Sequence, residues 1–505
     1  MKGIVAAGDA VTAEAGAKIL REGGNAFDAV LAAMMTAPHT EPMLSSLGGG
    51  GFLLAAEAGE EPVLYDFFVD VPPNRVDIPD FFPIYVDFGN TVQEFHIGAG
   101  STAVPGMIAG IESIYEELCS LPMQRIVAPA VEAASKGVVL SSMQAGFVKL
   151  LEPILLSTQE SAAIYAPDGR LIDDKNDFVN REYADFLLRF AEEGASCFYS
   201  SDISEAIGNY YASNDGLLRA EDLKNYSVQK RKPVSLNYHS CDIYTNPPPS
   251  AGGVLIAFTL KMLSEGSATS TDSFEYVREL IESFAITEEF RRTHIDPHIH
   301  DEYAEKIMDD ESLISHYLMS VGSRVNLWGN TTHISVMDEY GNCASATMTN
   351  GEGSGMIAPG TGIMMNNMLG EEDLNPHGFF AWKSGVRLPS MMAPTIAMRE
   401  GEPILILGSA GSNRIRSAIT EVLDRYIRFS EAVKEAVEAP RIHYEKGKLF
   451  FEPGYDDSIL RRVAQRYPDM TVFDEKSLFF GGVNAVTGDF QGAADSRRGA
   501  AVSIV

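Results

Sequence analysis

Apolar residues recur at helical spacing near the start of the chain. The stretch Asp9–Arg21 shows this spacing and runs into a pair of glycines, which predicts a helix that stops there. Asn25 follows as a helix cap, and Asp28 stands where a capping box places its acidic residue. We therefore expect a second helix from Ala26 to about Ala37.

The next apolar run follows the letters SSLGGGG and predicts a short strand. From about Ala130 to Asp310 the pattern is mainly helical. The letters TNPPPSAGG interrupt it: Pro247–Pro249 should end an extended segment, and Ser250 or Gly253 should lead into a helix.

From Thr331 onward the pattern changes to strands. Thr331–Met337 and Cys343–Thr349 are separated by the turn-forming stretch Asp338–Asn342, which predicts a hairpin. A second hairpin is expected around a turn at Glu400–Glu402, followed by a small-residue loop and a helix from near Ile415. Strands at both ends with helices between them predict one α+β body.

Composition narrows the possible partners. The chain has 505 residues, of which 45% are hydrophobic, and a formal net charge of −31. That charge argues against nucleic acid and anionic membrane surfaces, which need basic patches. We expect no membrane-spanning segment, because no run approaches about 18 apolar residues. The cysteines have no CxxC or zinc-ligand spacing, so we expect a reducing compartment and place the protein in the cytoplasm; they are Cys119, Cys197, Cys241 and Cys343.

Two motifs suggest ligands but are better explained without them. The run Gly48–Gly51 lacks the lysine and hydroxyl of a phosphate-binding loop and precedes a strand, so we expect close backbone packing there. The letters HIDPHIH bring together His294, His298 and His300, which raises a metal hypothesis. Pro297 interrupts the segment, and we expect a solvated loop and no metal.

Thr331 is the candidate for chemistry. A threonine in a strand is usually only a β-former. As a nucleophile it needs a base, and its own α-amine can serve if the chain is cut immediately before it. The strand edge at Thr331 and the small-residue loop Gly408–Asn413 would supply the nucleophile and the backbone donors. From the residues alone, both interpretations stay open.

A series of stretches resembles the γ-glutamyltranspeptidase family of N-terminal-nucleophile hydrolases, nearly end to end and in the same order. They are REGGNAFDAVLAA, LGGGGFLL, STAVPGMIAGI, NPPPSAGG, GNTTHISVMDEYGN, GIMMNNM, LPSMMAPTI, LGSAGSNRI and GAADSRRGAAV. The resemblance implies a four-layered αββα fold and catalysis without a metal or organic cofactor. It also implies a precursor that cuts itself into residues 1–330 and 331–505. These two subunits stay together as a heterodimer, and further dimerisation is left open.

The resemblance assigns the catalytic roles residue by residue. Cleavage falls between Asn330 and Thr331. The freed amine of Thr331 is then the general base, and its hydroxyl is the nucleophile that forms an acyl-enzyme. Thr349 matches the threonine that orients the nucleophile. Gly411 and Ser412 match the pair whose backbone N–H groups form the oxyanion hole.

At the positions that bind substrate in the family, this sequence keeps some residues and changes others. Ser390 matches a serine that binds the substrate α-carboxylate, and Asn350 is a stand-in for a polar residue in a shortened motif. Glu371 matches the acid that binds the substrate amine, with Glu372 as a rival. Phe68 stands where the family has the arginine that grips the α-carboxylate, and phenylalanine cannot replace that bidentate pair.

Other departures also concern the substrate. Met391 replaces the second serine of the carboxylate pair, and Met368 replaces a Gln or Glu. The stretch Asn375–Lys383 is shorter than the usual lid loop, which implies an open mouth. If another cation binds the carboxylate, the nearest candidate in the sequence is Arg387, three residues before Ser390.

Taken together, these features predict a self-processing threonine amide hydrolase that cleaves γ-glutamyl amides of the glutathione type, with hydrolysis favoured over transfer. The first rival is an acylase or small-amide hydrolase of the same family, whose acyl group lacks an α-carboxylate; Phe68, Met368 and Met391 favour it. The second rival is an uncut, inactive scaffold. Because of Phe68, we expect a poor match to donors with a free α-carboxylate.

Overall fold

Two antiparallel sheets lie face to face at the centre of the computed structural model, which describes residues 2–87, 92–307, 331–375 and 377–505. Neighbouring strands in both sheets are antiparallel. The first sheet has the order β20 (Ala501–Ile504), β1 (Gly3–Ala7), β9 (Thr332–Asp338), β10 (Cys343–Thr349), β2 (Gly50–Ala56), β3 (Val63–Phe67) and β6 (Gln229–Arg231). The second has the order β19 (Gly492–Ala494), β18 (Gly482–Thr487), β14 (Glu402–Ala410), β13 (Thr395–Arg399), β8 (Cys241–Thr245) and β7 (Val234–Tyr238).

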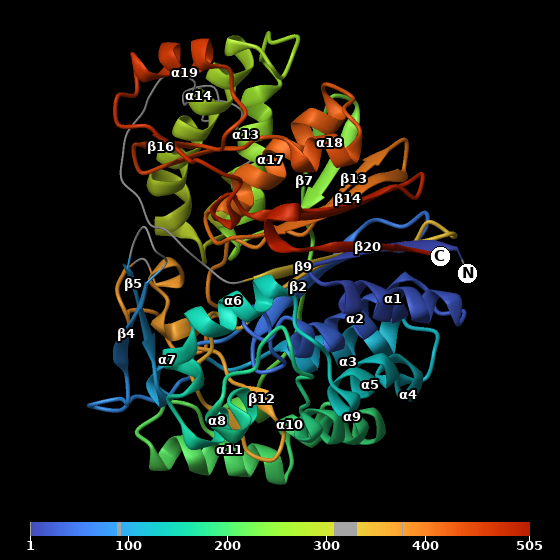
Figure 1. Ribbon diagram of the computed structural model, residues 1–505, viewed down its shortest axis with the longest axis vertical. Helices are drawn as coiled ribbons and strands as arrows, with labels where there is room; N and C mark the ends of the chain where they lie inside the picture. The colour runs from blue at the N-terminus through green and yellow to red at the C-terminus, as the bar shows by residue number, and fades with distance from the viewer. Residues whose placement is uncertain (1, 88–91, 308–330, 376) are drawn as a thin grey trace.

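Helices cover the outer face of each sheet and complete four layers (Figure 1). Below the first sheet lie α1 (Ala10–Arg21), α2 (Ala26–Thr40), α3 (Met107–Leu118), α5 (Ala128–Lys136) and α9 (Arg181–Glu193). Above the second lie α13 (Ala251–Leu263), α14 (Phe274–Phe290), α17 (Arg414–Ile427), α18 (Val433–Glu438) and α19 (Asp457–Ala464). This arrangement confirms the α+β class and shows the four αββα layers.

Shorter elements join these layers. The helices among them are α4 (Met123–Ile126), α6 (Ser142–Leu150), α7 (Glu152–Leu155), α8 (Gln159–Tyr165), α10 (Ser196–Tyr199), α11 (Asp202–Ser213), α12 (Ala220–Lys224) and α15 (Glu302–Lys306). The strands are β4 (Phe82–Asp87), β5 (Val92–Ile97), β11 (Ile357–Ala358), β12 (Ile363–Met364), β15 (Ile442–Glu445), β16 (Lys448–Phe451) and β17 (Thr471–Val472).

Strand β9 shows how side-chain alternation sets up the site. Ile334 and Val336 pack in the core formed with the helices below the sheet. Successive strand residues point to opposite faces, so His333 and Ser335 point toward the second sheet. Polar contacts join the sheets there: Asn484 Nδ2 donates to the carbonyl of His333 at 2.8 Å, and Ser335 Oγ donates to the carbonyl of Asn484 at 3.2 Å. By the same alternation, Thr331 faces the space between the sheets.

The first two helices match their expected ends closely. Asp9 caps α1 by accepting from the N–H of Val11, and Asn25 with Asp28 forms the capping box of α2. The second helix runs to Thr40, three residues beyond the expectation, because it continues through Pro38. Both expected hairpins are confirmed, as β9–β10 and β13–β14.

Two expectations about the middle of the chain need correction. The region expected to be mainly helical also contains β6, β7 and β8, although α13 begins directly after Ser250 as expected. The segment expected as a solvated loop is helical: a π-helical turn at Arg291–Ile295 continues α14, and a 3₁₀ turn follows at Asp296–His298. Pro297 fits because it lies in the first turn of that short helix, where a missing N–H costs nothing.

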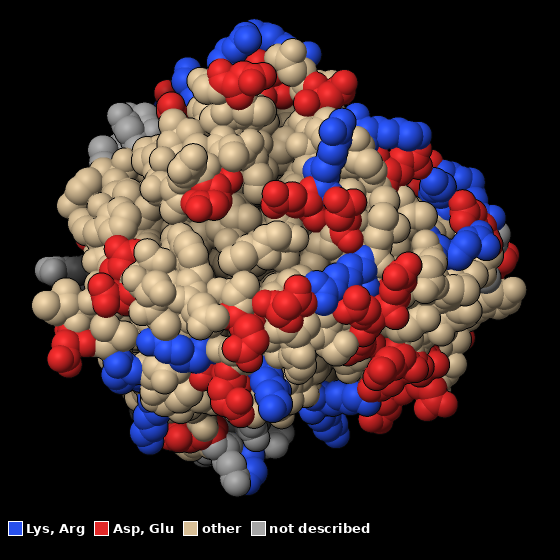
Figure 2. Space-filling view, turned by 90° about the horizontal axis from the view of Figure 1, so that it is seen from below, with Lys and Arg blue, Asp and Glu red and all other residues tan. Residues whose placement is uncertain are grey.

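The formal net charge of −31 reflects an excess of acidic over basic groups, and groups of both signs lie on the one face that Figure 2 draws. On the face drawn in Figure 2, acidic and basic side chains are interspersed around a broad uncharged region. In the part of the chain that the structure describes, no helix has both the length and the apolar content needed to cross a membrane.

Candidate active site

Thr331 lies immediately before β9, where the first sheet meets the second. The residue is only 5% exposed. Thr332 pairs with Met348 of β10, and continuing this register places Thr349 opposite Thr331. The hydroxyl oxygen of Thr349 accepts from the N–H of Gly351 at 3.1 Å, which fixes its rotamer. The two threonines assigned to catalysis are thus brought together, whereas Asn330 lies outside the described residues.

The two residues after Thr331 have structural roles. Thr332 points away from the second sheet and donates to Glu41 Oε2 at 2.7 Å. Burial and the charge of Asp9 raise the pKa of Glu41 to about 8. His333 is hydrogen-bonded to Thr347 and Ser335, at 2.8 and 2.9 Å, and burial lowers its pKa to about 3. A neutral histidine with both nitrogens engaged does not serve as the base for Thr331.

The glycine run Gly48–Gly51 packs against this strand end, as expected. A Cβ atom on Gly49 would lie 2.2 Å from the carbonyl oxygen of Thr349, and one on Gly51 would lie 2.6 Å from that of Thr347. Glycine is therefore needed for close approach of β2 to β10.

The loop after β14, residues 411–413, presents two backbone N–H groups, and we refer to it as the oxyanion loop after its proposed role. Gly411 and Ser412 both have positive φ, at 118° and 49°. Among the described residues, neither N–H donates a hydrogen bond. The Ser412 hydroxyl donates to Asp373, and the Asn413 amide donates to Glu445 Oε1 at 2.8 Å, so both side chains of the loop are held. Two adjacent free N–H groups in a fixed loop are the arrangement that an oxyanion hole requires.

A cluster of buried polar side chains follows Thr349 directly. Both polar side-chain atoms of Asn350, one carboxylate oxygen of Glu352 and one of Glu371 are buried and have no hydrogen-bond partner within the described chain. The Glu371 oxygen lies only 2.1 Å from where a Cβ on Gly351 would stand, so Gly351 makes room for it. Burial and then the charge of Glu352 raise the pKa of Glu371, and burial also raises that of Glu352.

This cluster separates the two candidate acids. Glu371 has a buried oxygen in the cluster, whereas Glu372 is exposed. Sequence reasoning missed Glu352, which is 2% exposed and follows Asn350 by two residues. The only signal for it was its position in the letters TNGEG. Unpaired buried acceptors of this kind suit a ligand ammonium group.

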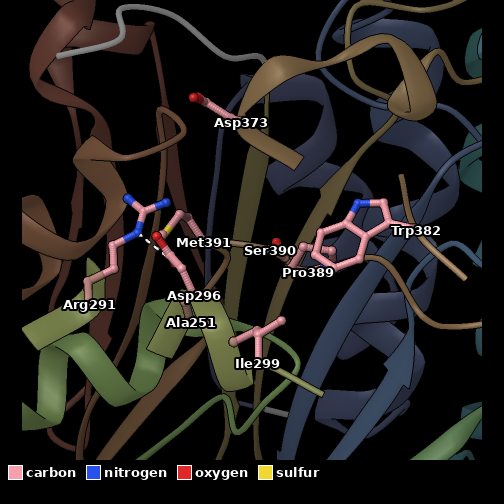
Figure 3. Close-up of a pocket in the computed structure, with 9 residues that line it drawn as sticks. All are labelled: Ala251, Arg291, Asp296, Ile299, Asp373, Trp382, Pro389, Ser390 and Met391. Atoms are coloured by element: carbon pink, nitrogen blue, oxygen red, sulfur yellow. Dashed lines mark hydrogen bonds and ion pairs between the residues drawn. The ribbon is translucent and has the colours of Figure 1, made fainter. Parts of the chain in front are cut away.

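Ser390 lines a pocket beside the oxyanion loop (Figure 3). The pocket is open to solvent, and its walls are Ala251, Arg291, Asp296, Ile299, Asp373, Trp382, Pro389, Ser390 and Met391. Asp373 connects the pocket to the loop, because it accepts the hydrogen bond from Ser412. Trp382, from the short lid stretch, forms one wall and donates to the carbonyl of Leu374 at 2.9 Å.

The structure buries Phe68, which the family resemblance places at a substrate-binding position. The side chain of Phe68 is 0% exposed and stacks on Phe52 with ring centroids 5.3 Å apart. It fills the core, together with Met368, which is also 0% exposed. A side chain with no accessible surface has nothing to present to a ligand.

Arg387 is also unsuitable as a replacement cation. Its Nε atom lies 3.0 Å from Asp70 Oδ1, and its Nη1 atom lies 3.4 Å from Asp66 Oδ1. It also donates to the carbonyls of Phe68 and Ser227. This guanidinium is 7% exposed and is used to join β3 to the segment before Ser390. The pocket holds a different arginine, Arg291, which sequence reasoning did not single out.

The histidines of the HIDPHIH segment are held apart by separate partners. His294 contacts the hydroxyl of Tyr303, His298 contacts Asp301, and His300 contacts the carbonyl of Arg387. Within the described residues, no group of three or more His, Cys, Asp or Glu side chains could hold a metal ion.

Comparison with known proteins agrees with this geometry. The family model described as Gamma-glutamyltranspeptidase matches residues 12–505. The chain is 26% identical to the glutathione hydrolase proenzyme of Bacillus subtilis (strain 168), covering 99% of this chain and 91% of that protein. It is 28% identical to the Acylase ACY 1 proenzyme of Pseudomonas sp. (strain V22), covering 92% and 86%.

A solved structure shares the same fold. The crystal structure of cephalosporin acylase from Bacillus halodurans superposes with a TM-score of 0.87 at 21% identity, covering 99% of this chain and 95% of that one. The family model spans nearly the whole sequence, and the fold has the four layers that the family resemblance implied. This chain therefore belongs to the γ-glutamyltranspeptidase family of N-terminal-nucleophile hydrolases.

Proposed function

We propose that this protein is a self-processing amide hydrolase that cleaves γ-glutamyl-type amides through an acyl-enzyme on Thr331. In the cut enzyme, the Thr331 amine takes the proton of its own hydroxyl as that oxygen attacks the amide carbon. The N–H groups of Gly411 and Ser412 stabilise the oxyanion. The amine then returns the proton to the departing amine, and water opens the ester by the same route.

The observation that carries the substrate class is the unpaired polar cluster beside Thr349. Asn350, Glu352 and Glu371 offer buried acceptors without a protein cation among their described contacts. Burying such groups unpaired is costly, so the cluster is explained best by a ligand that donates to it. We infer that the acyl group carries an ammonium, as the γ-glutamyl group does, and that Glu371 is its main partner.

The alternative hypothesis is an acylase whose acyl group carries no amine. It is supported by the similarity to a protein named as an acylase. The p-nitroanilides of 4-aminobutyrate and butyrate separate the two, because they differ only in the amine. If the protein cleaves γ-glutamyl-type amides, kcat/KM should be higher for the 4-aminobutyryl anilide than for the butyryl anilide. Equal rates, or a preference for butyryl, would instead support the acylase.

Glu371→Gln should lower that amine preference by about 30-fold or more, since losing one member of a buried charged pair typically costs on the order of 2–5 kcal/mol. The neighbouring Glu372→Gln, in an exposed side chain, should change the amine preference little.

Because the pKa values of Glu352 and Glu371 are raised, the pair retains a proton near neutrality. The amine preference should therefore strengthen as the pH rises, and a preference that is flat with pH would argue against this pair.

We also propose that the enzyme works in the cytoplasm and favours hydrolysis over transfer. The four cysteines are free thiols in the structure, which suits a reducing compartment. The ratio of hydrolysed to transferred product in the presence of a dipeptide acceptor tests the second point.

A further inference from the structure

We propose that Arg291, together with Ser390, binds a carboxylate of the acyl donor in the pocket beside the oxyanion loop. This inference rests on the proposed function, which supplies the acyl group, and adds a second recognition element to the ammonium site at Glu371. Ser390 is the serine that the family resemblance already assigns to a carboxylate, so the new element is Arg291, which does not stand where the family has its arginine.

Arg291 lies at one end of the pocket with one side of its guanidinium fixed (Figure 3). Nε lies 3.1 Å from Asp296 Oδ1, and Nη1 donates to Asn413 Oδ1 at 3.0 Å. Within the described residues, Nη2 has no hydrogen-bond partner. The side chain is 11% exposed, and it contributes to the pocket wall. A held guanidinium with a free terminal nitrogen is pre-organised to bind an anion.

Ser390 supplies a second donor. Its Oγ accepts from the N–H of Met392 at 3.0 Å, and among the described residues its own proton has no acceptor. The Ser390 carbonyl accepts from the N–H of Ala251 at 2.8 Å, so the backbone is anchored on the first turn of α13. A carboxylate accepts several hydrogen bonds and would use both the hydroxyl and the guanidinium.

The two acids in the pocket are already engaged. Asp296 pairs with Arg291, and Asp373 accepts from the side chains of Ser412 and Asn413. The remaining walls include Ile299, Met391 and Trp382, which can pack against methylene groups. The pocket thus pairs one anion-binding end with apolar walls, the chemistry of a short aliphatic carboxylate.

The position of Arg291 links this pocket to the loop after β14. Its partner Asn413 directly follows Ser412, whose N–H is one of the two proposed oxyanion donors. An acyl chain that reaches Arg291 would therefore pass beside the oxyanion loop. This arrangement reverses the expectation drawn from Phe68, because donors with a free carboxylate should be preferred.

Four p-nitroanilides test the inference: γ-glutamyl, glutaryl, 4-aminobutyryl and butyryl. They form a two-by-two set in which the carboxylate and the amine are removed independently. Wild type should favour glutaryl over butyryl, and γ-glutamyl over 4-aminobutyryl, by about 10- to 100-fold in kcat/KM. Arg291→Gln should bring both ratios close to one while the amine preference remains. Arg291→Lys should retain part of the carboxylate preference.

Arg292→Gln is the matched control, since Arg292 is the exposed neighbour and lies outside the pocket wall. It should keep both ratios. If Arg291→Gln lowers all four substrates equally, Arg291 acts only by holding Asn413 and the inference is wrong. It is also wrong if wild type shows no carboxylate preference. A carboxylate preference without an amine preference would overturn the proposed function and leave this inference standing.

A measurement on wild type alone covers the case in which Arg291→Gln does not fold. Glutarate should inhibit cleavage of the butyryl anilide about tenfold or more strongly than butyrate does, because only glutarate carries the second carboxylate. Equal inhibition would contradict the inference. Ser390→Ala should weaken the glutarate effect while leaving butyrate inhibition unchanged.

Discussion

Phe68 has a different role in the structure from the one that its position in the sequence suggests. Its ring is completely buried against Phe52, and its backbone carbonyl accepts a hydrogen bond from Arg387. The position next to the site is thus used for packing. The missing arginine is a departure from the family pattern, and the phenylalanine that replaces it is buried in the core.

Phe68→Arg should therefore destabilise the enzyme and not restore a carboxylate site. An unpaired buried charge beside the guanidinium of Arg387 should lower the free energy of unfolding by about 3–5 kcal/mol. Phe68→Leu, which keeps the site apolar, should lower it by about 1–2 kcal/mol. Thermal unfolding of both variants tests this. A stable Phe68→Arg protein with improved γ-glutamyl turnover would show that the side chain reaches the substrate after all.

Features that depend on residues close together in the sequence were predictable, whereas features that depend on contacts between distant residues were not. The capping box of Asn25 and Asp28 depends on residues three apart, so the sequence contains all of it. Arg291 acquires its place in the pocket only because the fold brings it to Ser390, about a hundred positions away. Glu352 is similar, since its importance comes from burial next to Glu371.

Among the elements, the loop after β14 shows most clearly how backbone conformation limits which residue a position can hold. Gly411 has φ of 118°, and a Cβ there would lie 2.9 Å from the Cα of Gly481. The loop was predictable from the small residues between a strand and a helix. Its conformation was not, because it depends on the close approach of Gly481 from the segment before β18.

Gly411→Ala should lower kcat on the order of 100-fold with little change in KM, because it shifts a backbone donor that acts in the transition state. Gly360→Ala is the matched control: Gly360 also has positive φ, 70°, but its Cβ would meet nothing within 4 Å. That variant should lose about 1 kcal/mol of stability and keep its activity. If both variants have wild-type kcat, the loop does not form the oxyanion hole.

The helical turn that carries Arg291 was the element least accessible from sequence. Pro297 argues for a break, yet α14 continues into a π-helical turn that ends just before it. That turn directs Arg291 toward Asn413, so the irregular end of the helix places the residue on which the carboxylate inference depends.

For the whole molecule, the proposed cut would divide the chain without dividing the fold. Strands β1, β2, β3 and β6 precede residue 330, whereas β9, β10 and β20 of the same sheet follow it. The second sheet is shared in the same way, with β7 and β8 before the cut and β13, β14, β18 and β19 after it. Two such pieces would remain associated through the ladders and cores of both sheets. The four-layer body was predictable from the family resemblance, whereas strand order required the structure.

The central claim is that Thr331 becomes the N-terminal residue of a second polypeptide. Mass spectrometry of the purified active protein under denaturing conditions tests this most directly. We predict two fragments, residues 1–330 and 331–505, of roughly 36 and 19 kDa when 54.8 kDa is divided by length. Thr331→Ala should remain a single inactive chain, because it lacks the attacking hydroxyl. An active wild-type protein that contains only the intact chain would show that Thr331 does not act as an N-terminal nucleophile.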